Sequence, residues 1–324
     1  MALLHSPAAA YPGASEARTQ MSGGRLKTLL ATLCLMVLGA AAPAFCATTH
    51  NSHHRRHRVA RLSADDPGLK SAAAYVVDQG DSEVWYAHNA NVASPIASIT
   101  KLMTALVVAD AHQPLDEVLE VTPEDRAIGK GAYSRLAIGT RLTRGDLLHL
   151  ALMSSENRAA HALGRNYPGG VPAFVKAMNA KAQSLGMTSS HFVEPTGLSS
   201  DNVASPEDLS RLVMAAARNP TIRDFSTDTE HSVRIGRRMV AFRTTDALVR
   251  NPGWNIVVQK TGYITEAGRC LVMQAVIGGR NMVIVLLNSF GKYTRVADAV
   301  RMRRWIEARM SEHNAAHVVA STDS

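Results

Sequence analysis

A serine followed three residues later by a lysine stands at the start of a long apolar run, and this pair constrains the chain more than any other feature. Ser98 and Lys101 lie in the stretch PIASITKLMTA, which we expect to form a largely buried helix. Residues three apart on a helix are neighbours, so the lysine amine can reach the serine hydroxyl directly. A serine nucleophile needs such a base, and burial lowers the pKa of a lysine. The alternative is that Ser98 is only a helix N-cap.

Two further motifs follow in order along the chain. Ser155-Glu156-Asn157 comes directly after an apolar helix predicted over 147–153, and Lys260-Thr261-Gly262 lies in a strand predicted over 255–262. The order S-x-x-K, S-x-N, K-T-G is the motif set of active-site serine penicillin-binding proteins and serine β-lactamases. Three short motifs in this order are far more specific than any one of them, so they favour a catalytic Ser98 over an N-cap.

The elements predicted around the motifs form an antiparallel sheet built from both ends of the chain. Residues 73–87 indicate a β-hairpin, and 268–278 and 282–288 indicate two more strands joined by a glycine-containing turn. An amphipathic helix over 296–310 would cover one face of this sheet. The intervening residues 117–225 are mostly helical in pattern. We therefore expect an α+β fold, with a helical subdomain inserted into a sheet flanked by helices.

Within the insertion, helices are predicted over 157–165, 171–185 and 206–218. Ser205 and Pro206 suit the N-cap and first position of the last of these helices. Residues 225–242 are polar, and we expect them to form extended segments that approach the cleft. A cleft between the sheet and the helical region is a normal place for a ligand.

The N-terminal 46 residues have the pattern of a secretory signal peptide. A basic pair precedes the apolar run 29–41, which is too short to span a membrane, and small residues follow it. Met21 stands just before the basic pair and is the expected true start. Phe45 before Cys46 argues against a lipoprotein anchor. We expect a periplasmic protein that has no integral membrane segment after processing.

The segment 47–68 is rich in histidine and arginine and lacks apolar periodicity, which predicts a flexible tail; a metal-binding tract is the alternative. The catalytic domain is predicted over 69–312, and 313–324 is predicted to be a disordered tail. Cys270 is the single cysteine of the expected domain, in an apolar strand, and is interpreted as a buried hydrophobe. The formal charge of +8 favours an anionic partner without choosing among membrane, nucleic acid and acidic polymer.

Longer stretches around the motifs extend the likeness. The sequences PIASITKLMTA, SSENRAA, FVEPTGL and FGKY resemble those of the low-molecular-mass penicillin-binding proteins, in particular the D-alanyl-D-alanine endopeptidase branch. The likeness runs from about residue 70 to 310 and implies the β-lactamase/transpeptidase-like fold. It also implies that peptidoglycan stem peptides are the substrate, that D-alanyl to meso-diaminopimelyl cross-links and terminal D-alanine are the cleaved groups, and that β-lactam antibiotics acylate Ser98.

The resemblance and the chemistry of the side chains together suggest a role for each motif residue. Ser98 attacks the peptide carbonyl, Lys101 accepts its proton, and Ser155, Asn157 and Lys260 relay a proton to the leaving amine. Lys260 and Thr261 hold the carboxylate end of the ligand, and Gly262 allows close approach of the backbone. The resemblance implies that the backbone N–H groups of Ser98 and Tyr263 form the oxyanion hole. No cofactor and no catalytic metal are expected.

The sequence leaves four alternative functions to compare with this one. A serine β-lactamase shares the motifs, but Glu194-Pro195 is not followed by the Glu-x-x-x-Asn pattern of its deacylating loop. A non-catalytic wall-binding protein does not require the complete motif set. A zinc peptidase is suggested by thirteen histidines, but H-E-x-x-H is absent from the sequence. A nucleic-acid partner is not expected, because the signal peptide removes the chain from nucleic acid.

Overall fold

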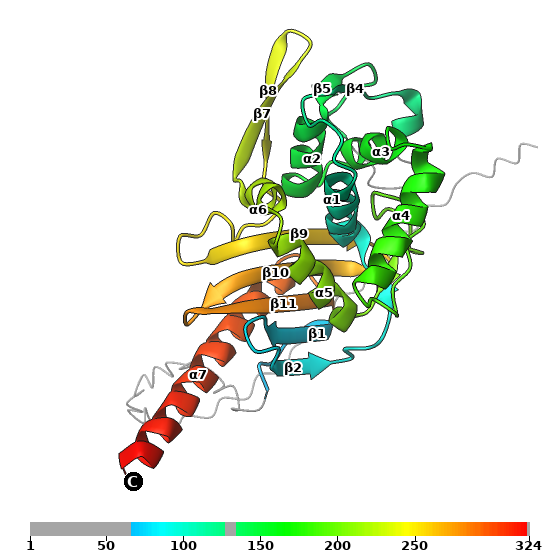
Figure 1. The fold of residues 1–324 in the computed structure, drawn as a ribbon. Coiled ribbons are helices and arrows are strands. Elements are labelled where there is room, and N and C mark those ends of the chain that lie inside the picture. Colours follow the sequence, from blue (N-terminus) through cyan, green and yellow to red (C-terminus); the bar gives the residue numbers. More distant parts are fainter. Residues whose placement is uncertain (1–65, 127–133, 323–324) are drawn as a thin grey trace, which may run out of the picture. The chain divides into compact units, whose positions relative to one another are not determined.

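The computed structural model describes residues 66–126 and 134–322, with side chains through residue 312 (Figure 1). The predicted signal peptide and the basic segment through residue 65 therefore lie outside the described residues. Among the described residues, no helix combines the length and apolar character that crossing a bilayer requires.

The centre of the fold is a five-stranded antiparallel sheet in the order β2-β1-β11-β10-β9. Its strands are β1 (Ser71–Asp78), β2 (Val84–His88), β9 (Asn255–Ile264), β10 (Gly268–Ile277) and β11 (Arg280–Ser289). The pairing of β1 with β11 joins the N-terminal hairpin to the C-terminal strands. This confirms the predicted sheet from both ends of the chain, and it leaves β9, which carries the third motif, at an edge.

Helices cover both faces of the sheet (Figure 1). Side chains alternate between the two faces of a strand, so Val272 and Val285 pack toward the helical region, whereas Leu271 and Ile284 pack toward α7 (Thr294–Thr322). Trp305 is among the α7 residues buried there, as predicted. The helix is longer than the range 296–310 predicted from sequence, and it continues through 313–322, for which the sequence predicts a disordered tail.

The helical region lies between β2 and β9 in the chain. Its helices are α1 (Thr100–Asp110), α2 (Arg144–Met153), α3 (Asn157–Arg165), α4 (Gly170–Ser184), α5 (Pro206–Ala217) and α6 (Pro220–Thr227). Short elements complete it: β3 (Ser94–Pro95), η1 (Ala97–Ile99), β4 (Val118–Glu120), η2 (Pro123–Asp125), β5 (Arg141–Thr143) and β6 (Val203–Ala204). The predicted helical insertion is confirmed.

The segment predicted to be extended over 225–242 is partly helical. Asn219 accepts a hydrogen bond from the Ile222 N–H and Pro220 takes the first helical position, so α6 forms and ends at Thr227. Only then does the chain form the hairpin of β7 (Glu230–Ile235) and β8 (Arg238–Arg243). The cap signal of α6 lies at Asn219 and Pro220, before this segment, and the sequence prediction did not use it.

Cys270 is fully buried in β10, and this burial raises the pKa of its thiol to about 11. A thiol with so high a pKa is protonated at neutral pH and is a poor nucleophile. The interpretation of Cys270 as a packing residue is confirmed.

We expect Ser205→Ala to lower the free energy of unfolding by about 1 kcal/mol, because its hydroxyl accepts the Asp208 N–H at the start of α5. Ser184→Ala, at an exposed position at the end of α4, is the matched control and should change stability by less than about 0.5 kcal/mol. Urea denaturation followed by circular dichroism measures both. Equal destabilisation by the two substitutions would contradict the capping role.

Candidate active site

Ser98 lies in the short turn η1, immediately before α1, rather than on the helix itself. The N-cap of α1 is Ile99, so the interpretation of Ser98 as an N-cap is wrong. Ala97 holds a left-handed conformation with φ of 50°, which is uncommon for a residue with a side chain. The Nζ of Lys101 donates a hydrogen bond of 2.9 Å to the Ser98 Oγ, as the three-residue spacing predicts.

Lys101 is fully buried, and its amine is surrounded by acceptors from separate parts of the helical region. Its Nζ also donates to the Asn157 Oδ1 at 2.8 Å and to the Thr196 carbonyl at 2.5 Å. Burial lowers the pKa of Lys101 to about 8, against the opposing effect of the Glu194 and Glu156 carboxylates. A neutral amine next to the Ser98 hydroxyl is therefore accessible close to neutral pH.

Ser155 and Asn157 occupy the junction of α2 and α3. Ser155 has a φ of 61°, and Asn157 is the first residue of α3, so both side chains reach the same site from a tight turn. The residue between them points elsewhere: the Glu156 carboxylate accepts the backbone N–H groups of Arg135 and Leu136. The predicted placement of the second motif on a turn after α2 is confirmed.

Lys260 connects the second motif to the third. From β9 its fully buried Nζ donates to the Ser155 Oγ at 2.9 Å and to the Thr261 carbonyl at 2.9 Å. Burial holds the pKa of Lys260 well below its usual value, and the nearby charges of Lys101 and Arg295 lower it further. Two serine–lysine pairs, Ser98 with Lys101 and Ser155 with Lys260, thus lie at one site.

Gly262 allows β9 to pass directly beside η1, the turn that contains Ser98. A Cβ added at this residue would lie 2.9 Å from the Ile96 carbonyl oxygen and 3.2 Å from the Ser98 nitrogen. Neither neighbour is the end of a flexible side chain, so a larger residue requires the strand or the turn to shift. The predicted close approach of the backbone at Gly262 is confirmed.

Thr261 and Gly262 of the third motif and the following Tyr263 line a cavity of about 340 Å³. Thr261 shares a hydrogen bond of 2.6 Å with the Thr245 hydroxyl, and Tyr263 is half exposed at the rim. The cavity lining comprises Ser98, Arg135, Ser154, Ser155, Glu156, Asn157, Leu198, Thr245, Thr261, Gly262, Tyr263, Arg269 and Arg295. The structure therefore brings the motif residues together, with the two lysine amines buried behind the lining.

Sequence reasoning missed the three arginines of this cavity, Arg135, Arg269 and Arg295. Burial, followed by the charge of Arg269, lowers the pKa of Arg295, and its guanidinium lies 3.4 Å from the Gly262 carbonyl oxygen. Arg269 stacks over the Tyr263 ring. Arg295 lies in the first turn of α7, one residue before the helix predicted over 296–310, so the sequence did not assign it to a site.

Comparison with known proteins agrees with this arrangement. The profile of the peptidase S11 family, described as D-alanyl-D-alanine carboxypeptidase, matches residues 60–291. A D-alanyl-D-alanine endopeptidase of Pseudomonas aeruginosa is 50% identical over 241 residues, which are 74% of this chain and 78% of the relative. One of Escherichia coli, also named D-alanyl-D-alanine endopeptidase, is 44% identical over 285 residues, 87% of this chain and 89% of the relative.

Solved structures show the same fold. The crystal structure of a Streptomyces DD-transpeptidase matches with a TM-score of 0.68 at 26% identity, covering 73% of this chain and 97% of that one. A D-alanyl-D-alanine carboxypeptidase of Mycobacterium tuberculosis matches with a TM-score of 0.68 at 27% identity, covering 74% and 91%. The fold and site thus define a serine peptidase of the transpeptidase-like class. The chain belongs to the peptidase S11 family, which confirms the resemblance drawn from its motifs.

We expect Gly262→Ala to slow acylation by penicillin about 100-fold, since a shift of the strand or turn by an ångström misaligns the attacking hydroxyl. Gly253→Ala is the control, because its Cβ would meet the end of the Asn251 side chain, which can move. Stopped-flow labelling with fluorescent penicillin measures the rate. An unchanged rate in Gly262→Ala would show that the close contact is not required.

Proposed function

We propose that this chain is a periplasmic serine D-alanyl-D-alanine endopeptidase that cleaves the peptide cross-links of peptidoglycan through an acyl-enzyme at Ser98. The observation that carries the proposal is the 2.9 Å hydrogen bond from the buried Lys101 amine to the Ser98 hydroxyl. The names of the Pseudomonas and Escherichia relatives support the substrate class. Terminal D-alanine is a second substrate of the same chemistry.

Acylation begins with attack of the Ser98 Oγ on the carbonyl carbon of D-alanine, while the Lys101 amine takes the hydroxyl proton. The tetrahedral intermediate then collapses, and the bond from carbon to the leaving nitrogen breaks as that nitrogen gains a proton. Ser155 supplies this proton from its hydroxyl and regains one from Lys260, to which it is hydrogen-bonded. Water then attacks the ester carbonyl carbon and gives one proton through Ser155 to Lys260, the bond from that carbon to the Ser98 Oγ breaks, and Lys101 returns its proton to the Oγ as the free carboxylic acid leaves.

The oxyanion of the intermediate needs two donors, and we assign them to the backbone N–H groups of Ser98 and Tyr263. The close passage of β9 beside Ser98 supports this assignment. A Cβ at Gly262 would lie 3.2 Å from the Ser98 nitrogen, and Tyr263 is the next residue of the strand. Preorganised donors of this kind stabilise the charge that develops on the carbonyl oxygen, and losing one typically slows a reaction by about 100- to 1,000-fold.

Positive charge at one end of the cavity suits the leaving-group side of the substrate. Arg269 and Arg295 line the cavity together with Thr261 and Gly262, and the buried Lys260 directly precedes Thr261 in β9. In a cross-link and in a terminal D-alanyl-D-alanine alike, the scissile nitrogen belongs to a residue with a free carboxylate next to it. The same cations can hold that carboxylate in both substrates, which supports endopeptidase and carboxypeptidase action at one site.

A serine β-lactamase is the alternative reading of the motifs, and the position of Glu194 argues against it. Its carboxylate accepts the backbone N–H groups of Thr196 and Gly197 and the side-chain amide of Asn202. A carboxylate occupied in this way holds its own loop together and is not free to activate water. We therefore expect the penicillin ester of Ser98 to be long-lived, so that β-lactam antibiotics act as inhibitors.

We expect Ser98→Ala to abolish both labelling by fluorescent penicillin and cleavage of the cross-linked muropeptides in purified sacculi, since it removes the nucleophile. Ser311→Ala, at an exposed position of α7, is the control and should retain both. Muropeptide analysis also separates loss of dimers from loss of terminal D-alanine. Persistent loss of dimers in Ser98→Ala would disprove the nucleophile, and rapid hydrolysis of penicillin by the unaltered protein would favour the β-lactamase.

The pKa of Lys101 predicts how the reaction depends on pH. Because the neutral amine is the base and its pKa is about 8, the acylation rate should rise about tenfold per pH unit below pH 8 and level off above it. Penicillin labelling measured from pH 5.5 to 9.5 gives the profile. A Lys101→Arg variant stays protonated throughout and should lack the rise, whereas a flat profile in the unaltered protein would exclude Lys101 as the base.

A further inference from the structure

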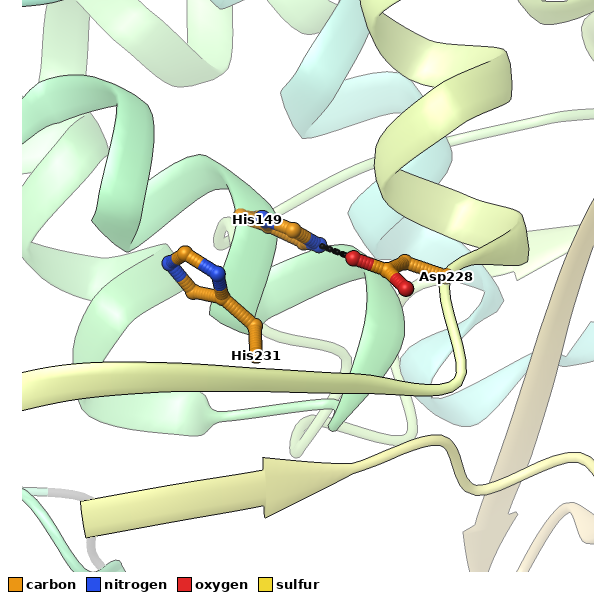
Figure 2. A group of neighbouring side chains, drawn as sticks. All are labelled: His149, Asp228 and His231. Carbon is orange, nitrogen blue, oxygen red and sulfur yellow. Dashed lines mark ion pairs between the residues drawn. The ribbon is translucent and has the colours of Figure 1, made fainter.

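A cluster of three side chains outside the cavity has the composition of a metal site. His149 of α2, Asp228 at the end of α6 and His231 of β7 each place one nitrogen or oxygen within 4.8 Å of those of the other two (Figure 2). None of the three lines the active-site cavity. Imidazole nitrogen and carboxylate oxygen are common ligands of zinc in proteins.

His149 carries the strongest signal, because its buried Nε2 has no partner other than the Asp228 carboxylate. The side chain is only 9% exposed, and the Nε2 points at the Asp228 carboxylate, whose Oδ2 lies 3.3 Å away (Figure 2). The ring is held in place between Phe225 and His231, with centroid distances of 4.3 and 4.1 Å.

His231 is oriented by a second carboxylate. Its Nε2 lies 2.9 Å from the Asp146 Oδ1, an arrangement in which the ring donates its Nε2–H and keeps the lone pair on Nδ1. One nitrogen of the ring faces the side of His149 and Asp228 in Figure 2. A histidine bound to a metal commonly donates its other ring nitrogen to a carboxylate, which fixes the tautomer and strengthens the ligand.

We infer that the His149 Nε2, the His231 Nδ1 and the Asp228 carboxylate bind a zinc ion, with Asp146 as the outer carboxylate that orients His231. Zinc–ligand distances of about 2.0–2.1 Å in a tetrahedral site put ligand atoms about 3.3–3.4 Å apart. The pair His149–Asp228 already has this spacing, at 3.3 Å. The ligand atom of His231 lies within 4.8 Å of the other two and must move closer to bind the same ion, and the partial exposure of His231 and Asp228 leaves a path for entry.

The ion would join three segments that lead to the active site. α2 ends at Met153, directly before Ser154 and Ser155, and α6 is attached to β9 through the 2.6 Å bond from the Gln259 side chain to the Ser226 carbonyl. The hairpin of β7 and β8 begins just after Asp228. Zinc at this position is a structural clamp, and its existence does not depend on which peptide the enzyme cleaves.

Equilibrium dialysis of the whole metal-stripped chain against zinc chloride tests the site. Because the histidines of the basic segment can also bind zinc, the readout is the difference between proteins: Asp228→Asn and His231→Gln should each lose one zinc equivalent per chain. His191→Gln, an exposed histidine outside the cluster, is the control and should lose none. Circular dichroism verifies that each variant is folded, and the nearly isosteric Asp228→Asn keeps the test decisive if His231→Gln unfolds.

Two further measurements separate a built site from loose binding. Asp146→Asn should keep the zinc equivalent but weaken its affinity about 10- to 100-fold, the effect expected of an outer carboxylate. Cobalt bound to the unaltered chain should give an intense visible absorption typical of four-coordinate geometry, and Asp228→Asn should lose it. Equal zinc stoichiometry and affinity in the unaltered chain, Asp228→Asn and His231→Gln would overturn the proposal.

Discussion

The burial of two lysine amines is the constraint on which the rest of the structure depends. An ammonium group in an apolar interior is strongly unfavourable unless acceptors surround it or it gives up its proton. Here both solutions act on Lys101: its amine has the Ser98 hydroxyl, the Asn157 amide and the Thr196 carbonyl as acceptors, and its pKa is lowered. The same desolvation that costs stability makes the amine a base near neutral pH. Stability and reactivity therefore trade against each other at this site.

Backbone packing around η1, the turn that contains Ser98, holds the Ser98 hydroxyl in a defined position. Gly262 approaches the turn from β9, and Gly197 approaches it from the loop before β6, where an added Cβ would lie 1.9 Å from the Ala97 carbonyl oxygen. The carboxylate of Glu194 holds the second of these segments in shape. Ala97 keeps its left-handed conformation between them. A turn confined by backbone from two directions is preorganised, so little reorientation is needed when the substrate arrives.

Much of the fold follows from local signals, and the misses have identifiable causes. Ser205 and Pro206 marked the start of α5 correctly, because capping depends on residues within one turn of each other. The predicted end of the last helix near residue 310 was too early, since no glycine or proline follows to stop it. Arg269 and Arg295 were missed because their neighbours predict only a strand and a packing helix. Their presence in the cavity depends on where the sheet places those elements.

By itself the sequence determined the chemical class of this protein, through the spacing of Ser98 and Lys101 and the order of the three motifs. A three-residue spacing sets a contact wherever the chain is helical or nearly so, and no other segment is needed. Tertiary structure alone decided the pairing of Lys260 with Ser155, the lowered pKa values and the meeting of His149 with His231. These depend on burial and on contacts between distant segments, and both arise only when the sheet and helices pack.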